Sequence, residues 1–178
     1  MRTILTLVAV LALAASASAA MTLDWTITEP SPGLYKAVGT LTADAGKTVN
    51  AVDGEFTTDG TFNQVLLFGA MPTPYASQMG FATDPLDTHF LYADTEVVVA
   101  IAAAETDTSI SAAIGILGGT GVEDFIQILG VAGTVVNYDF IGADNTGAEF
   151  TNVGSFVLPE PASLGLLALG VLGLLRRR

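Results

Sequence analysis

The chain has 178 residues, a formal net charge of −12 and no cysteine, so disulfides, thiol catalysis and cysteine-ligated zinc are excluded. Residues 20–158 hold 17 of the 18 acidic residues but only Lys36 and Lys47 as basic ones, which gives this part a formal charge of −15. Such a charge repels a phosphate backbone, so it argues against nucleic-acid binding and serves mainly to keep the domain in solution.

The N-terminus has the three-part pattern of a secretory signal peptide. Arg2 supplies a positive charge, an apolar stretch follows, and small residues close the segment. Ala17 and Ala19 fit the small-x-small rule, so we predict a signal peptide over residues 1–19 with cleavage after Ala19. Cleavage after Ala17 or Ala20 is the alternative, and the apolar run is short for a retained membrane helix.

Residues 20–158 are predicted to form one domain of short β-strands. Apolar and polar residues alternate with a period of two in Leu23–Thr28, Ala51–Phe56 and Val136–Phe140, which is typical of strands with one buried and one wet face. Turn residues separate the strands, and this spacing predicts an all-β, antiparallel β-sandwich that is jelly-roll-like. Further strands are predicted at Leu34–Thr42, Thr61–Phe68, His89–Ala93, Glu96–Ala102, Ser109–Leu117, Asp124–Leu129 and Ala148–Val157.

Two stretches of this domain are less regular. Val97–Glu105 is rich in alanine and could form a helix, but its three consecutive valines favour a buried strand. Met71–Pro85 contains three prolines, so we predict a long loop there, the best place for sequence variation or partner contact.

The C-terminus has three parts in order. Pro159-Glu160-Pro161 comes first, and its prolines favour an extended, accessible strip. An apolar stretch over residues 162–175 follows, and the cluster of Arg176, Arg177 and Arg178 ends the chain. A helix of this length spans about 21 Å against roughly 30 Å for a bilayer core, so snorkelling arginines have to lengthen it. We therefore predict a marginal transmembrane helix with its arginines on the cytoplasmic side.

Together these parts resemble the PEP-CTERM sorting signal, over residues 159–178. The resemblance implies recognition by an exosortase, a transpeptidase-like membrane enzyme, with cleavage near Pro159-Glu160-Pro161. It also implies a bacterial protein that is held briefly in the membrane and then delivered to the cell surface or beyond, in cells that make extracellular polysaccharide and biofilm matrix. Because the middle domains of such proteins are diverse, the resemblance transfers a destination and no catalytic residue.

The middle domain carries no recognisable catalytic arrangement. His89 is the only histidine, so a histidine-rich metal site is excluded, and the residue is expected to be a strand or surface residue. Acidic pairs such as Asp53 with Glu55, or Glu123 with Asp124, could serve a glycosidase, but nothing in their context distinguishes them. We therefore predict a protein that is not an enzyme and needs no cofactor.

Calcium is the one metal that the acidic turns suggest. Asp139, Asp144, Asn145 and Glu149 gather around one turn, and their oxygen atoms suit this hard cation. A second acidic group consists of Asp84, Asp87, Asp94 and Glu96. Neither group has the spacing of an EF-hand loop, and turn formation by Asp and Asn explains most of the pattern.

Aromatic residues offer a second kind of binding site. Trp25 and Tyr138 fall on apolar strand faces, so we expect them in the core. Tyr75, in the proline-rich loop, is the best exposed residue for stacking on a sugar ring.

The leading hypothesis is an exported, non-catalytic protein of the cell surface or extracellular matrix. Its expected partners are the secretion machinery, an exosortase, the membrane and extracellular polysaccharide. A secreted calcium- or carbohydrate-binding module is the alternative, and a secreted hydrolase is the third hypothesis.

Overall fold

The structure is a computed structural model that describes residues 21–65, 71–91 and 97–160. The predicted signal peptide with Ala17 and Ala19, the predicted membrane helix, Pro161 and the three terminal arginines lie outside the described residues. Within the described ranges, no helix combines the length and the apolar character that crossing a bilayer requires.

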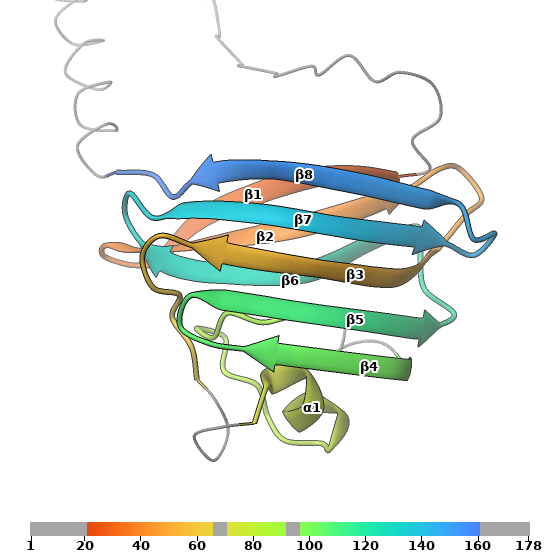
Figure 1. Ribbon diagram of the computed structural model, residues 1–178, viewed down its shortest axis with the longest axis horizontal. Helices are drawn as coiled ribbons and strands as arrows, with labels where there is room; N and C mark the ends of the chain where they lie inside the picture. Colours follow the sequence, from red (N-terminus) through yellow and green to blue (C-terminus); the bar gives the residue numbers. More distant parts are fainter. Residues whose placement is uncertain (1–20, 66–70, 92–96, 161–178) are drawn as a thin grey trace, which may run out of the picture.

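The described part of the chain folds into two antiparallel sheets and one short helix. A three-stranded sheet has the order β1-β2-β6, and a five-stranded sheet has the order β4-β5-β3-β7-β8. The sheets pack face to face (Figure 1), which confirms the all-β sandwich, while jelly-roll connectivity stays a prediction. The elements are β1 (Met21–Ser31), β2 (Leu34–Ala43), β3 (Val49–Thr58), α1 (Thr73–Gln78), β4 (Val97–Glu105), β5 (Ser109–Leu117), β6 (Val122–Val131), β7 (Val135–Asp144) and β8 (Glu149–Val157).

The alternation of the sequence decides which side chains of a strand are buried. In β5, every second residue from Ile110 to Ile116 is buried, and the residues between them are exposed or half-buried. Short turns that contain glycine connect neighbouring strands at tight hairpins. Gly33, between β1 and β2, has a φ of 80°, and Gly147, between β7 and β8, has a φ of 78°. An L side chain would be strained in this left-handed conformation, which is why glycine stands at both turns.

Aromatic rings fill the space between the sheets. Phe56 of β3 lies at the centre, with ring centroids of five other aromatic residues 5.9–6.4 Å away. Those five residues are Trp25, Phe90, Phe125, Tyr138 and Phe140. The expected core positions of Trp25 and Tyr138 are thus confirmed. Gly54 lets β3 and β7 pair closely, since a Cβ there would overlap the side chain of Phe140.

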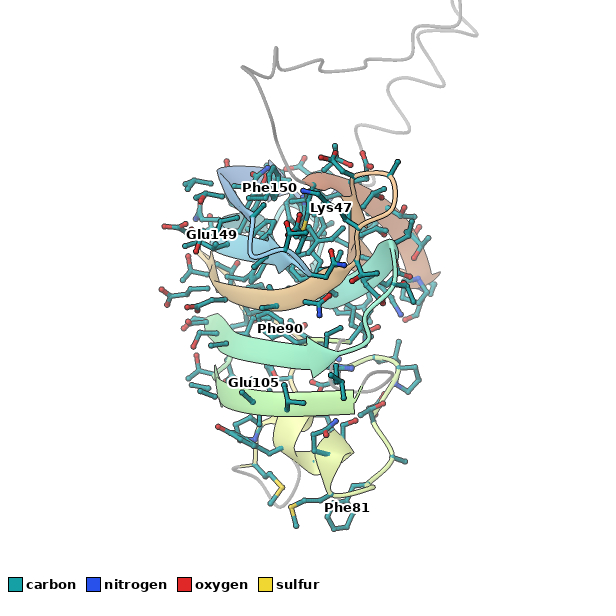
Figure 2. All side chains as sticks on the ribbon, turned by 90° about the vertical axis from the view of Figure 1, so that its right-hand side faces the viewer. Lys47, Phe81, Phe90, Glu105, Glu149 and Phe150 are labelled. Carbon is teal, nitrogen blue, oxygen red and sulfur yellow. The ribbon has the colours of Figure 1, made fainter. Side chains whose placement is uncertain are left out.

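The three-stranded sheet is narrower than the five-stranded sheet and leaves the inner faces of β4 and β5 uncovered, and residues 61–65 and 71–91 close this part of the core. Phe62 and His89 form isolated bridges with Gly130 and Gln127 on the edge of β6. Phe90 is fully buried, with its ring 5.9 Å from that of Phe56. Figure 2 shows Phe90 inside the sandwich.

The structure corrects three local predictions in this covering segment. The described part of the strand predicted at Thr61–Phe68 makes one bridge only, and so does the described part of His89–Ala93. The stretch Met71–Pro85 is not loop throughout, because Thr73–Gln78 forms α1. Pro74 lies in the first turn of this helix, where its fixed φ suits a helix and its missing N–H costs nothing. The strand predicted at Val97–Glu105 is confirmed, but it is not a buried strand, because Val99 is 64% exposed.

Replacing Phe56 with alanine should lower the free energy of unfolding by about 3–5 kcal/mol, because it leaves a cavity at the centre of the aromatic cluster. Phe81, which is 40% exposed, provides the matched control, and its replacement with alanine should lower the free energy of unfolding far less. Urea denaturation of the two variants measures the difference. Equal losses in the two variants would show that Phe56 is not the centre of the core.

Candidate functional site

The first candidate site is the junction where the folded domain meets the C-terminal tail. Leu158, the residue after β8, is fully buried beside Tyr35 and Ala37 of β2. Partly buried residues complete this small cluster, among them Trp25 and Phe156, whose ring centroids lie 4.5 Å apart. The last apolar residue before the prolines is therefore part of the core.

Backbone hydrogen bonds hold the same residue on the turn between β6 and β7. The N–H of Leu158 donates to the carbonyl of Thr134 at 2.9 Å, and its carbonyl accepts from the N–H of Gly133 at 2.9 Å. Gly130 makes room for the leucine, since a Cβ at that position would lie 2.9 Å from Leu158 Cδ1. The chain is thus fixed on both its side-chain and its main-chain atoms just before the tail starts.

The structure describes two of the three predicted processing residues, and both lie directly beyond this anchor. Pro159 is half-buried and Glu160 is exposed. The side chain of Glu160 lies over Gly133, where a Cβ would come within 3.3 Å of Glu160 Oε1. No spacer separates the domain from the motif.

The second candidate site is a cluster of buried polar side chains under α1. The cluster joins α1, the segment before β4, the end of β4 and the middle of β6. It comprises Thr73, Asp87, Thr88, His89, Glu105 and Gln127, each no more than 7% exposed. Burial of so many polar groups requires hydrogen bonds between them or to the backbone.

Asp87 is the centre of this buried polar cluster. Its Oδ1 accepts from the N–H of Val65 at 2.6 Å, and its Oδ2 accepts from the hydroxyl of Thr73. His89 Nδ1 lies 3.6 Å from Asp87 Oδ2. The side-chain amide of Gln127 donates to the carbonyl of Asp87 at 2.6 Å. Through its carboxylate Asp87 thus contacts Val65 and α1, and through its main-chain carbonyl it contacts β6.

Glu105 is the least satisfied member of the cluster. Its Oε2 accepts from the N–H of Thr73 at 2.7 Å, whereas its Oε1 is buried and has no hydrogen-bond partner. Burial raises the pKa of Glu105 to about 7, and the nearby negative charge of Asp87 adds to this effect. Burial also raises the pKa of Asp87, although its hydrogen bonds act against the rise.

The geometry of the cluster fits a structural role better than nucleophilic catalysis. The hydroxyl of Thr73 donates to the carboxylate of Asp87. A catalytic hydroxyl would instead donate to the histidine, which the acid would orient from its other side. The contacts fasten α1 and the covering segment to β6. The expectation of His89 at a strand or surface position therefore misses its burial in this network.

The predicted calcium residues do not converge. Asp144 Oδ1 accepts three hydrogen bonds from Thr146 and Ala148 within its own turn, and Asp144 Oδ2 lies 2.6 Å from Lys47 Nζ. The ion pair with Lys47 and these hydrogen bonds hold the pKa of Asp144 well below its usual range. Asn145 Oδ1 accepts from the N–H of Thr48 at 3.4 Å. Calcium binding at this turn stays a prediction, and the ammonium group of Lys47 already neutralises its central carboxylate.

The side chains of the other two predicted ligands do not converge with that of Asp144. Glu149 pairs with Ala143, the neighbour of Asp144, so its exposed side chain lies on the opposite face of the sheet from the buried Asp144. Asp139 is five residues earlier on β7, which corresponds to about 17 Å along a strand. Glu149 begins β8 and is exposed; Figure 2 shows it at the margin of the molecule. Within residues 21–65, 71–91 and 97–160, no three histidine, aspartate or glutamate side chains are placed to hold a metal ion together.

The remaining predicted acidic residues are held at turns or on open sheet faces. Asp53 and Glu55 point to solvent from β3, as expected, and Glu55 accepts from the hydroxyl of Ser109 at 3.0 Å. Glu123 accepts from the N–H of Thr120, and Asp124 accepts from the hydroxyl of Thr40 at 2.6 Å. In the second acidic group, Asp84 is exposed and Asp87 is buried, while Asp94 and Glu96 lie outside the described residues.

Tyr75 is not the exposed stacking residue that the sequence predicts. Its side chain is half-buried, and its hydroxyl accepts from the N–H of Ala103 on the edge of β4 at 2.9 Å. This contact fixes the hydroxyl and packs the residue beside the sheet.

Comparison with known families identifies the tail. Residues 157–178 match the family described as the PEP-CTERM protein-sorting motif, which bears out the resemblance noted in the sequence. Such a motif marks an exported protein that an exosortase processes and that associates with the membrane or the cell surface. Among curated proteins, none matches the chain.

Replacing Glu105 with glutamine should flatten the dependence of stability on pH. The pKa of Glu105 in the folded protein is about 7, above the usual 4.5. The protonated carboxyl group therefore contributes to the free energy of unfolding fully below pH 4.5, and this contribution is lost as the pH rises through 7. As the pH rises from 4.5 to above 7, the free energy of unfolding of the wild-type protein should fall by up to about 3 kcal/mol relative to that of the E105Q variant. Urea denaturation at several pH values measures the effect, and the exposed Glu55→Gln variant is the control. Parallel curves for wild type and E105Q would contradict the assignment.

Replacing Leu158 with alanine should lower the free energy of unfolding by about 2–5 kcal/mol, although the residue adjoins the tail. Leu117 is 67% exposed, so Leu117→Ala is a matched control that should change stability little. Chemical denaturation checks both variants. A change at Leu158 as small as that at Leu117 would mean that the junction is not part of the core.

Proposed function

We propose that this protein is an exported, non-catalytic component of the cell surface or the extracellular matrix, released from the membrane by an exosortase. The observation that carries the proposal is a sorting motif, residues 157–178, that overlaps the β-sandwich at the fully buried Leu158. The chain is thus a folded domain attached directly to its processing site.

The anchored junction suits such processing. Leu158 and the turn at Gly133 hold the start of the motif at one fixed place on the domain surface. A cut beyond Leu158 leaves the hydrogen bonds and the packing of the sandwich intact, so the released domain keeps its fold. A cut before Leu158 would remove a buried leucine from the core, which would destabilise the product.

The use of the polar side chains supports a structural domain over an enzyme. Asp87, Glu105 and Gln127 fasten the covering segment, and Asp144 closes a turn with Lys47. The histidine that a hydrolase would need as a base is 1% exposed. Residence in a biofilm matrix with extracellular polysaccharide belongs to this proposal and rests on the nature of the sorting motif.

The alternative is a binding module that uses the outer face of the five-stranded sheet. Shallow hollows lie there, and the one lined by Glu55, Asn137, Tyr138 and Asp139 has a volume of about 400 Å³. Titration calorimetry of the exported protein with Ca²⁺ and with the polysaccharide of its own cells distinguishes the two. Measurable heat from either would favour the module.

Replacing Glu160 and Pro161 with alanine should block processing, so that the protein keeps its tail through Arg178. The chain offers a matched control, because Glu29-Pro30 is another Glu-Pro pair and lies at the exposed end of β1. The E29A/P30A variant should lose its tail as the wild type does. Intact mass spectrometry of the proteins recovered from cells reads the outcome. Loss of the tail in both variants would contradict the proposal.

A further inference from the structure

The two sheets end in four edge strands, β1, β6, β4 and β8. An edge strand presents unpaired N–H and C=O groups, which another strand can pair with, and proteins therefore protect their edges with covers, charges, prolines or bulges. Three of these edges carry such protection, and one does not.

The edge of β6 is covered by the chain itself. The backbone of Gln127 exchanges two hydrogen bonds of 3.0 Å with that of His89, and the carbonyl of Leu129 accepts from the N–H of Asn63 at 2.8 Å. The hydroxyl of Thr88 accepts from the N–H of Leu129 at 2.9 Å. Another strand cannot add here without displacing residues 62–63 and 88–89.

The edges of β4 and β1 are protected in other ways. On β4, the hydroxyl of Tyr75 accepts a hydrogen bond from the N–H of Ala103, and α1 packs beside the strand. The register of its pairing with β5 also shifts between Val98 and Ala100. On β1, the strand carries Asp24 and Glu29, ends near Pro30 and has a register shift of its own. Figure 1 shows α1 beyond β4 at one margin of the large sheet.

The edge of β8 has none of these protections. Its nine residues pair with β7 in one continuous register without a shift, and the strand contains no proline. Its only charge is Glu149, at its first position. Val153 and Val157 are 70% and 53% exposed. In the part of the chain that the structure describes, β8 makes no backbone hydrogen bond except with β7. Figure 1 shows this strand at the open margin of the sheet.

We infer that β8 pairs with β8 of a second copy of this chain, antiparallel and across a two-fold axis at Val153. The pairing would join the five-stranded sheets of the two copies into one continuous sheet of ten strands. Such an interface is self-complementary, as a two-fold dimer requires. The inference does not depend on how the tail is processed.

The charge distribution favours a second copy as the occupant. Two domains of formal charge −15 repel each other over most of their surface, but residues 150–157 carry no charge. In the symmetric register, Val153 faces its own counterpart, Thr151 faces Ser155, and Glu149 faces Val157. The two Glu149 carboxylates then lie at opposite ends of the interface, about 27 Å apart along the strands, so they do not oppose each other.

Sedimentation of the exported protein, in the form that cells release, tests this pairing. The wild type should sediment with twice the monomer mass at a concentration of about 100 µM. The V153K variant should sediment as a monomer, because two lysines would meet at the axis. The V99K variant is the matched control and should stay dimeric, since Val99 is 64% exposed but lies on β4. Circular dichroism confirms that each variant is folded.

Wild-type protein that is monomeric at every concentration would overturn the inference, and so would equal effects of the two lysines. A single cysteine gives a second readout, because the chain has none of its own. Under mild oxidation, V153C should form a disulfide-linked dimer faster than V99C by at least tenfold. Equal rates for the two cysteines would also overturn the pairing.

Discussion

The structure depends on one constraint, which is that a sheet of three strands and a sheet of five must share a single core. The aromatic cluster around Phe56 fills the space where the sheets overlap. Beyond that overlap, β4 and β5 have inner faces that no strand covers, and a segment without regular sheet structure has to cover them. That segment brings backbone polar groups into the interior, where they need partners. The buried contacts of Asp87, Glu105 and Gln127 provide those partners, so the polar cluster follows from the unequal widths of the sheets.

Most of the strands and the C-terminal sorting motif could be predicted from the sequence, and the covering segment could not. Alternation of apolar and polar residues is a local signal, and it located β1, β3 and β7 because each has one solvent-exposed face. The partners of Asp87 are distant in sequence, with Thr73 on α1 and Gln127 on β6, so no local pattern shows them. One signal was available. Gln127 interrupts the apolar run Phe125–Leu129, and a lone amide inside a buried strand implies a polar partner across the core. The hydrogen-bond partners of Asp144 also come from a turn and a distant lysine, which the clustering of acidic residues does not reveal.

The two edges of the five-stranded sheet differ in whether their backbone is covered. At the β4 margin, α1 and Tyr75 cover the backbone. At the β8 margin, the backbone is open, and the tail with the sorting motif leaves from the end of the same strand. Trp25 and Phe156 close the core behind β8, so the strand can remain exposed on its outer side without exposing the interior. Figure 1 shows the chain entering β1 and leaving β8 at opposite ends of the sandwich.

The bridges from residues 62 and 89 to β6 also bear on the order in which the fold can assemble. Gln127 comes 38 residues after His89, so a chain that crosses a membrane amino end first delivers Phe62, His89 and Phe90 well before the strand edge that receives them. Until β6 arrives, these aromatic rings have no complete pocket. Docking of the covering segment is therefore a late step that waits for a distant part of the chain, as in other folds rich in long-range contacts. Folding of this domain should be limited by the delivery of its second half and not by the speed of its hairpins.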